Sequence, residues 1–139
     1  MELGTQLIYD QKFQTTEGGF TIVVTPDFLA TLSFFGKGSM DITNALIAML
    51  EDVAAMVPGS EPKLRAIVNL GDLKGSPLRS QLVLGKWLFT RKDVAKKIAI
   101  YGGNPVEVKF TKAVMVIARM DRVGFFATED EARRWLMNP

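Results

Sequence analysis

The stretch from residue 63 to residue 93 constrains the fold more than any other part of the 139-residue chain. Residues 64–70 (LRAIVNL) are predicted to form a strand, residues 71–75 (GDLKG) a loop, and residues 76–89 a helix. A strand that passes into a helix through a glycine-containing turn is the centre of most α/β folds, whose sites usually lie at that turn. We therefore expect the functional part of the molecule at this turn.

Three polar residues of the turn form the candidate site. Ser76 is predicted as the N-cap of the helix, with Pro77 at its first position. Asp72, Lys74 and Ser76 form a candidate phosphosite or anion site, because a helix N-terminus favours negative charge and Lys74 adds a positive charge beside it. The alternative is structural, with Asp72 as a solvated loop acid and Ser76 as a plain cap. The segment is not a P-loop, because its lysine precedes the Gly-Ser pair.

Strands and helices alternate on both sides of this unit. Before it, the pattern predicts strands at 5–9, 12–16, 20–25 and 28–35, and a helix at 42–54 that is capped by Ser39 or Asp41 and ends at Pro58-Gly59. After it, the pattern predicts a strand at 97–101, a helix at 105–118 capped by Asn104, a strand at 122–126, and a last helix opened by a capping box at 128–131. The first four strands are expected to form two antiparallel hairpins. The alternation that follows indicates parallel strands joined by helices, so we predict one α/β domain with a mixed sheet.

The composition excludes several kinds of site. The chain contains no histidine and no cysteine, which rules out a Ser-His-Asp triad, a cysteine nucleophile and an ordinary zinc site. No apolar run reaches the roughly 18 residues that a membrane span needs. The N-terminus lacks the basic-then-apolar pattern of a secretory signal. We therefore predict a cytoplasmic protein that is not an enzyme and uses no metal or cofactor.

Positive charge is concentrated in residues 63–97. This segment holds nine basic and two acidic residues, so its net charge of +7 leaves −5 for the rest of a chain whose total is +2. The interpretation that needs no partner is a solvated helix face with a basic helix end. The functional interpretation is a surface for an anionic partner or ligand. Its candidate residues are Arg79, Lys86, Trp87, Arg91 and Lys92. We expect no nucleic-acid partner, because no known module and no interleaved aromatic residues accompany the bases.

The helices at 77–89 and 105–118 carry more apolar residues than one buried face requires. Leu78, Leu82 and Phe89 share one side of the first helix. In the second helix, Val106 is expected to point inward, whereas Val116 extends the apolar surface to another side. Either the helices are buried between other elements, or they expose a patch for a partner or lipid. Since large apolar patches are uncommon on monomers, we predict a homodimer.

The same stretches resemble the STAS fold of bacterial anti-sigma-factor antagonists, and more narrowly the SpoIIAA-like (STAS/SEC14-type) proteins. The similar segments are residues 68–76 (VNLGDLKGS), 85–88 (GKWL) and 123–136 (VGFFATEDEARRWL). The resemblance covers residues 20–137. It implies a STAS-like mixed sheet with an N-terminal antiparallel hairpin, parallel βα units and about four helices.

The resemblance also implies a mode of action. STAS domains act by binding partners, and some are switched by a kinase that phosphorylates the serine or threonine at this turn. Ser76 matches that position, although the usual Asp-Ser/Thr-Ser/Thr-Gly sequence is replaced by residues 74–77 (KGSP). The predicted function is a protein-interaction module whose partner is a regulatory kinase or a phosphoprotein. The alternative, from kinship to SEC14-type lipid carriers, is a carrier or sensor of a lipid or another apolar ligand.

Overall fold

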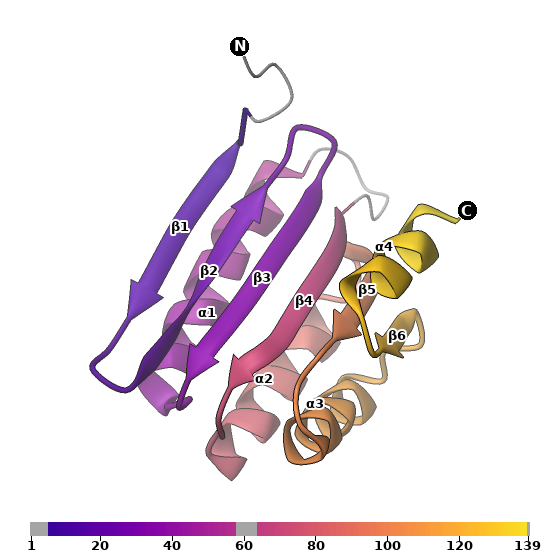
Figure 1. Ribbon diagram of the computed structural model, residues 1–139. Coiled ribbons are helices and arrows are strands. Elements are labelled where there is room, and N and C mark those ends of the chain that lie inside the picture. The colour runs from indigo at the N-terminus through magenta and orange to yellow at the C-terminus, as the bar shows by residue number, and fades with distance from the viewer. Residues whose placement is uncertain (1–5, 58–63, 139) are drawn as a thin grey trace.

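The computed structural model describes residues 6–57 and 64–138. In these residues six strands form one mixed sheet in the order β1-β2-β3-β4-β5-β6, accompanied by four helices (Figure 1). The strands are β1 (Tyr9–Gln14), β2 (Gly18–Val24), β3 (Leu29–Gly36), β4 (Leu64–Leu73), β5 (Ala95–Tyr101) and β6 (Val123–Phe126). The helices are α1 (Met40–Met56), α2 (Leu78–Thr90), α3 (Pro105–Ala118) and α4 (Glu129–Met137). The predicted α/β class with a mixed sheet is confirmed.

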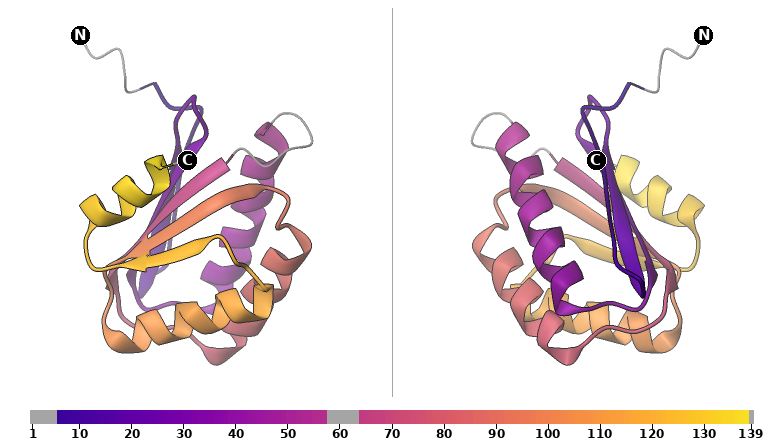
Figure 2. Two further views of the ribbon diagram at one scale, coloured as in Figure 1. Left: turned by 90° about the vertical axis from the view of Figure 1, so that its right-hand side faces the viewer. Right: turned by 90° about the vertical axis from the view of Figure 1, so that its left-hand side faces the viewer.

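The helices are divided unequally between the two faces of the sheet. α1, α2 and α3 cover one face, and α4 covers the other (Figure 2). β1, β2 and β3 pair antiparallel, whereas β3, β4, β5 and β6 run parallel. The carboxyl ends of β3 and β4 are therefore neighbours, with Gly36 opposite Leu73. The connections to α1 and α2 leave the sheet at this shared edge.

Each face of the sheet has its own apolar core. On the α1 side, the buried residues include Phe20, Ile22, Leu32, Leu46 and Val53. On the α4 side, the buried cluster is Leu29, Ile67, Ala99, Ala132 and Leu136. A third cluster, which includes Leu70, Ile98, Ile100 and Met115, joins the sheet to α3. Burial of this apolar surface is what holds the two helical layers on the sheet.

The prediction of a first hairpin at 5–9 and 12–16 is wrong. A single strand, β1, runs through this region and pairs along β2. The chain reverses only after β1, where the Thr15 N–H donates to the Gly18 carbonyl (2.8 Å). The Thr15 hydroxyl oxygen also accepts from the Glu17 N–H (3.2 Å). The reversal between β1 and β2 is thus a turn that the Thr15 side chain stabilises.

The second predicted hairpin, 20–25 with 28–35, is confirmed as β2 and β3. Of the two candidate caps of the first helix, the structure selects Ser39, whose Oγ accepts an N–H one turn into α1 (3.2 Å). Asp41 lies within the first turn, where its charge is favourable to the helix dipole. The predicted end of this helix at Pro58-Gly59 lies outside the described residues.

The central strand is longer than predicted. After a register shift in β3, Asp72 pairs with Phe35 and Leu73 with Gly36. Most of the predicted loop at 71–75 is therefore strand. The cause is pairing with a strand that is distant in sequence, which overrides the local turn propensity of the glycines.

The caps of the last two helices are confirmed. Asn104 Oδ1 accepts from the backbone N–H of Glu107 (3.0 Å), with proline at the first position of α3. Thr128 and Glu131 form the predicted reciprocal capping box of α4. The inward orientation predicted for Val106 is wrong, because its side chain is 71% exposed in the first turn of α3.

Candidate functional site

The turn between β4 and α2 is fixed to the neighbouring connection between β3 and α1. The Lys74 N–H donates to the Gly36 carbonyl (2.8 Å), and the Gly38 N–H donates to the Gly75 carbonyl (2.7 Å). Gly75 has a φ of 122°, a conformation that favours glycine. Both connections leave the carboxyl ends of adjacent parallel strands, which is where sites of open α/β sheets usually lie.

Ser76 does not cap α2, so this prediction is wrong, as is the placement of Pro77 at the first helical position. The helix begins at Leu78, with Pro77 as its N-cap residue and without a side-chain cap hydrogen bond. Because β4 extends to Leu73, the turn and the start of α2 lie further toward the C-terminus than the sequence predicted. Ser76 is half-buried against Gly38, where an added Cβ would lie 2.8 Å from the Ser76 Oγ. No hydrogen bond from the part of the chain that the structure describes occupies the Ser76 hydroxyl.

The other two residues predicted at this turn are exposed. Asp72 lies near the end of β4, and Lys74 is the first residue after the strand. Both precede the half-buried Ser76 in the chain and form no ion pair among the described residues. The turn therefore presents one acid and one base to solvent beside a half-buried serine, and it lacks the hydrogen-bonded groups that would activate a nucleophile.

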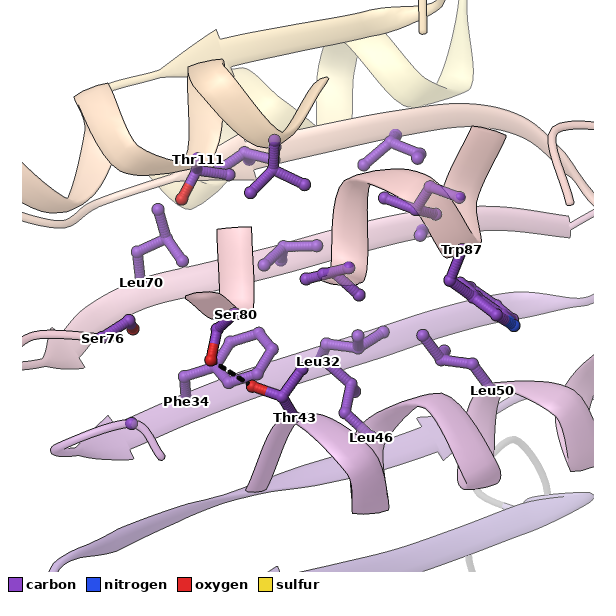
Figure 3. Close-up of a pocket in the computed structure, with 18 of the residues that line it drawn as sticks. Leu32, Phe34, Thr43, Leu46, Leu50, Leu70, Ser76, Ser80, Trp87 and Thr111 are labelled. Carbon is purple, nitrogen blue, oxygen red and sulfur yellow. Dashed lines mark hydrogen bonds between the residues drawn. The ribbon is translucent and has the colours of Figure 1, made fainter. Parts of the chain in front are cut away.

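A second feature lies behind the same turn. An apolar cavity of about 170 Å³ separates α2 from the sheet, and Figure 3 shows its lining side chains converging from α1, α2, α3 and the strands. Most of these residues are aliphatic or aromatic, including Leu32, Phe34, Leu46, Leu70, Leu84 and Leu88. Ser76 is also part of the lining, so the β4–α2 turn and the cavity share this residue. An apolar cavity of about 150 Å³ is large enough to bind benzene in another protein.

The cavity exists because α2 packs beside its neighbouring helices rather than directly on the sheet. Gly85 allows a close approach to α3, since a Cβ at this position would lie only 2.6 Å from Cγ2 of Ile117. Within α2, Ser80 and Gly85 are the buried residues, whereas Leu84 and Leu88 are only half-buried and line the cavity. The apolar surplus of this helix is thus explained in part by the cavity.

One end of the cavity carries hydroxyl groups. Thr43 of α1 and Ser80 of α2 are buried, and their Oγ1 and Oγ atoms lie 2.7 Å apart (Figure 3). Thr43 also donates to the Ser39 carbonyl (3.0 Å). Thr111 of α3 and Ser76 lie toward the same end in Figure 3. These groups are neutral, and the first two already satisfy one another.

The other end of the cavity carries charge. The Trp87 indole N–H donates to Oε2 of Glu51 in α1 (2.7 Å), and Nη2 of Arg91 lies 3.7 Å from Oε1 of the same carboxylate. Trp87 and Arg91 both line the cavity. The Nε of Arg91 is buried and has no hydrogen-bond partner among the described residues. Two of the residues predicted for a ligand or partner surface are therefore at the cavity.

The remaining predicted surface residues lie elsewhere. Arg79 and Lys86 are exposed on α2, and the Lys92 ammonium lies 5.0 Å from the centre of the Phe89 ring. Other bases of the same segment contact the opposite face of the protein: Lys97, for example, donates to backbone carbonyls at the C-terminal end of α4. Residues 63–97 therefore do not form one positive surface, and Lys63 lies outside the described residues.

Comparison with solved structures identifies the fold, whereas no family model and no curated protein matches the sequence. An uncharacterized protein of the DUF3478 family with a SpoIIAA-like fold, from Shewanella loihica PV-4, superposes with a TM-score of 0.68 at 20% identity. The match covers 89% of this chain and 98% of that chain. The chain has a SpoIIAA-like fold. The unphosphorylated anti-sigma factor antagonist SpoIIAA superposes with a TM-score of 0.49 at 13% identity, over 91% of this chain and 96% of that one.

The SpoIIAA-like sheet positions residues that the sequence pattern missed. Glu51 and Thr43 appear in the sequence only as polar residues of an amphipathic helix, and no local signal marks them. Glu107 is 3% exposed at the start of α3, and its Oε1 has no hydrogen-bond partner within the described residues. Burial raises the pKa of the Glu107 carboxyl above its usual range. The signal that could have identified the cavity was the apolar surplus of α2.

The described residues offer neither a metal site nor a membrane-spanning helix. No group of three or more acidic, histidine or cysteine side chains in residues 6–57 and 64–138 could hold a metal ion. Within the same ranges, no helix of this SpoIIAA-like domain is long and apolar enough to cross a membrane. The candidate site is accordingly the β4–α2 turn together with the cavity that it borders.

Proposed function

We propose that this protein is a non-catalytic, STAS-like regulatory module of the cytoplasm that binds a protein partner through the β4–α2 turn. The observation that carries the proposal is the Ser76 hydroxyl, which is not used as a helix cap and follows the exposed residues Asp72 and Lys74 in the β4–α2 turn. The SpoIIAA-like fold and the resemblance of residues 68–76 to STAS proteins support this role. A kinase or a phosphoprotein is the partner class that fits a hydroxyl beside a lysine.

Affinity purification with charge variants tests this proposal. Ser76→Asp places a negative charge at the turn, and Asn44→Asp places the same charge on an exposed position of α1 as the matched control. A partner retained by the wild type and by Asn44→Asp but lost or exchanged by Ser76→Asp supports the proposal. An identical set of partners for all three proteins contradicts it.

We also propose that the protein forms a homodimer through the exposed apolar residues of α2 and α3. Leu78 is 71% exposed, Leu82 50% and Val116 75%. The two helices therefore expose apolar side chains instead of burying all of them between other elements. Covering such a patch with a second copy removes apolar surface from water. Light scattering at micromolar concentration should show a dimer that Leu82→Glu dissociates. A monomeric wild type contradicts the proposal.

A second candidate function is supported by the cavity. We propose that the space under α2 binds an apolar ligand, since its lining is almost entirely aliphatic and aromatic and no side chain of the described residues fills it. Native mass spectrometry of freshly purified protein should detect a co-purified ligand. Leu84→Trp, which fills the space, should remove that ligand. A ligand that persists in the filled variant would contradict the assignment.

A further inference from the structure

The cavity is elongated along α2. Figure 3 places Ser80, at the hydroxyl end, and Trp87, at the charged end, apart along α2, and Arg91, which follows Trp87 at the end of the helix, is also part of the lining. At about 1.5 Å per residue, the helix advances about 16 Å between Ser80 and Arg91. A volume of about 170 Å³ spread over this length accommodates a single slender chain.

The charged end carries an unused donor. The Nε of Arg91 is buried without a hydrogen-bond partner among the described residues, and Arg91 is one of the residues that line the apolar cavity. A buried donor that gives up its water without gaining an acceptor destabilises the protein. A ligand oxygen at this end of the cavity would remove that penalty. At the opposite end the Thr43 and Ser80 hydroxyls are already paired, and the Ser76 hydroxyl that also lines the cavity is neutral.

Glu51 forms no close hydrogen bond with the Arg91 guanidinium. The distance of 3.7 Å between Glu51 Oε1 and Arg91 Nη2 exceeds that of a hydrogen bond, and the Glu51 side chain is 47% exposed. The carboxylate is held instead by the Trp87 indole N–H at 2.7 Å. The ion pair is therefore on the outer side of Arg91 and screened by water, whereas Nε is enclosed by protein.

We propose that the cavity binds a single-chain carboxylate whose chain lies under α2 and whose head accepts a hydrogen bond from Arg91 Nε. This rests on the second candidate function, binding of an apolar ligand in the cavity. A carboxylate fits the head position because the planar guanidinium forms its strongest hydrogen bonds with anionic oxygens. An ammonium head would be repelled by the guanidinium, and an alcohol would accept a weaker hydrogen bond because its oxygen carries no charge.

Calorimetric titration with decanoate, decanol and decylamine, each below its aggregation concentration, tests the head and the chain separately. The wild type should bind decanoate more tightly than decanol and should not bind decylamine. Arg91→Met, which keeps an apolar side chain of similar length, should weaken decanoate binding about tenfold or more while leaving decanol binding nearly unchanged. Glu51→Gln keeps an acceptor for the Trp87 indole but removes the competing charge, so it should strengthen decanoate binding severalfold.

Lys92→Met is the matched control, since it removes one positive charge near the same helix end from a side chain that lies over Phe89. It should leave the preference for decanoate unchanged, and thermal unfolding checks that each variant is folded. Equal binding of decanoate and decanol by the wild type, or equal losses in Arg91→Met and Lys92→Met, would overturn the carboxylate site while the apolar cavity remains. Failure of decanoate and decanol alike to bind the wild type would overturn both proposals.

Discussion

The hydroxyls of Thr43 and Ser80 lie 2.7 Å apart in the interior and join α1 to α2 at one end of the cavity. Both residues are buried, so each hydroxyl would be left without water if its partner were removed. The pair fixes the position at which α2 crosses α1, whereas the middle of α2 lies above an open space. This contact therefore sets the height of the cavity at its hydroxyl end.

Removing this hydrogen bond should destabilise the protein modestly. Ser80→Ala should lower the free energy of unfolding by about 1 kcal/mol, because Thr43 retains its bond to the Ser39 carbonyl. Thr43→Val should cost about the same or more, since it leaves the Ser80 hydroxyl with only the weak acceptor Met40 Sδ at 3.4 Å. Urea denaturation of both single variants and the double variant measures the coupling energy. Strictly additive losses would show that the two hydroxyls do not interact.

The close approach of α2 to α3 predicts an unusual effect of a helix-favouring substitution. Gly85→Ala gains up to about 1 kcal/mol of helix propensity, but its Cβ would lie 2.6 Å from Ile117 Cγ2. Overpacking of this kind costs about 1–3 kcal/mol, so we expect net destabilisation. Ile117→Ala in the same chain removes the Cγ2 contact but keeps the Ile117 Cβ, which would lie 2.7 Å from the new Cβ, so it should recover only part of the loss, compared with Ile117→Ala alone as the control. Increased stability of Gly85→Ala by itself would contradict the packing described for this helix pair.

The buried carboxyl of Glu107 predicts a dependence of stability on pH. Burial raises its pKa in the folded state, so the folded protein holds this proton more tightly than the unfolded chain does. The contribution of Glu107 to stability is therefore most favourable below the unfolded pKa, and it is lost as the pH rises through the folded pKa. Glu107→Gln should stabilise the protein at neutral pH and lose that advantage in acid. Glu17→Gln, at an exposed position, is the control and should show no such trend.

The position of Ser76 outside α2 predicts that its side chain contributes little to folding. Loss of an N-cap hydroxyl typically costs about 1 kcal/mol, but α2 has no side-chain cap to lose. Ser76→Ala should therefore change the free energy of unfolding by less than about 0.5 kcal/mol. Ser39→Ala, which removes the cap of α1, is the positive control and should show the full loss. A loss at Ser76 as large as that at Ser39 would contradict the helix start described here.

Local signals in the sequence were sufficient for much of the fold. The caps formed by Asn104 and Thr128 could be predicted because side chain and backbone N–H lie within one turn of sequence. Strand pairing between β2 and β3 followed from β-branched residues around a short turn. The start of α2 could not be predicted in this way, because it depends on the pairing of Asp72 with Phe35 across the sheet.

The cavity and its polar ends depend on contacts between helices. Periodicity showed that α2 has an apolar surplus, but not that Gly85 brings the helix against Ile117 and away from the sheet. Likewise, the pairing of Glu51 with Trp87 joins residues 36 positions apart. Trp87 and Arg91 were predicted as surface residues from the local charge pattern, whereas the structure places them beside an internal space. Such relationships follow from tertiary packing and have no local signature.

In the proposed function, the β4–α2 turn is the surface at which a partner is bound and regulated. The most direct test is the affinity of a recovered partner for wild type, Ser76→Ala, Ser76→Asp and the control Asn44→Asp, measured by calorimetry. Ser76→Asp changes the summed charge of Asp72, Lys74 and residue 76 from 0 to −1, so it should change the affinity by about tenfold or more in either direction. Ser76→Ala and Asn44→Asp should bind like the wild type. Equal affinity of all four proteins would show that the turn is structural only and would contradict the proposed function.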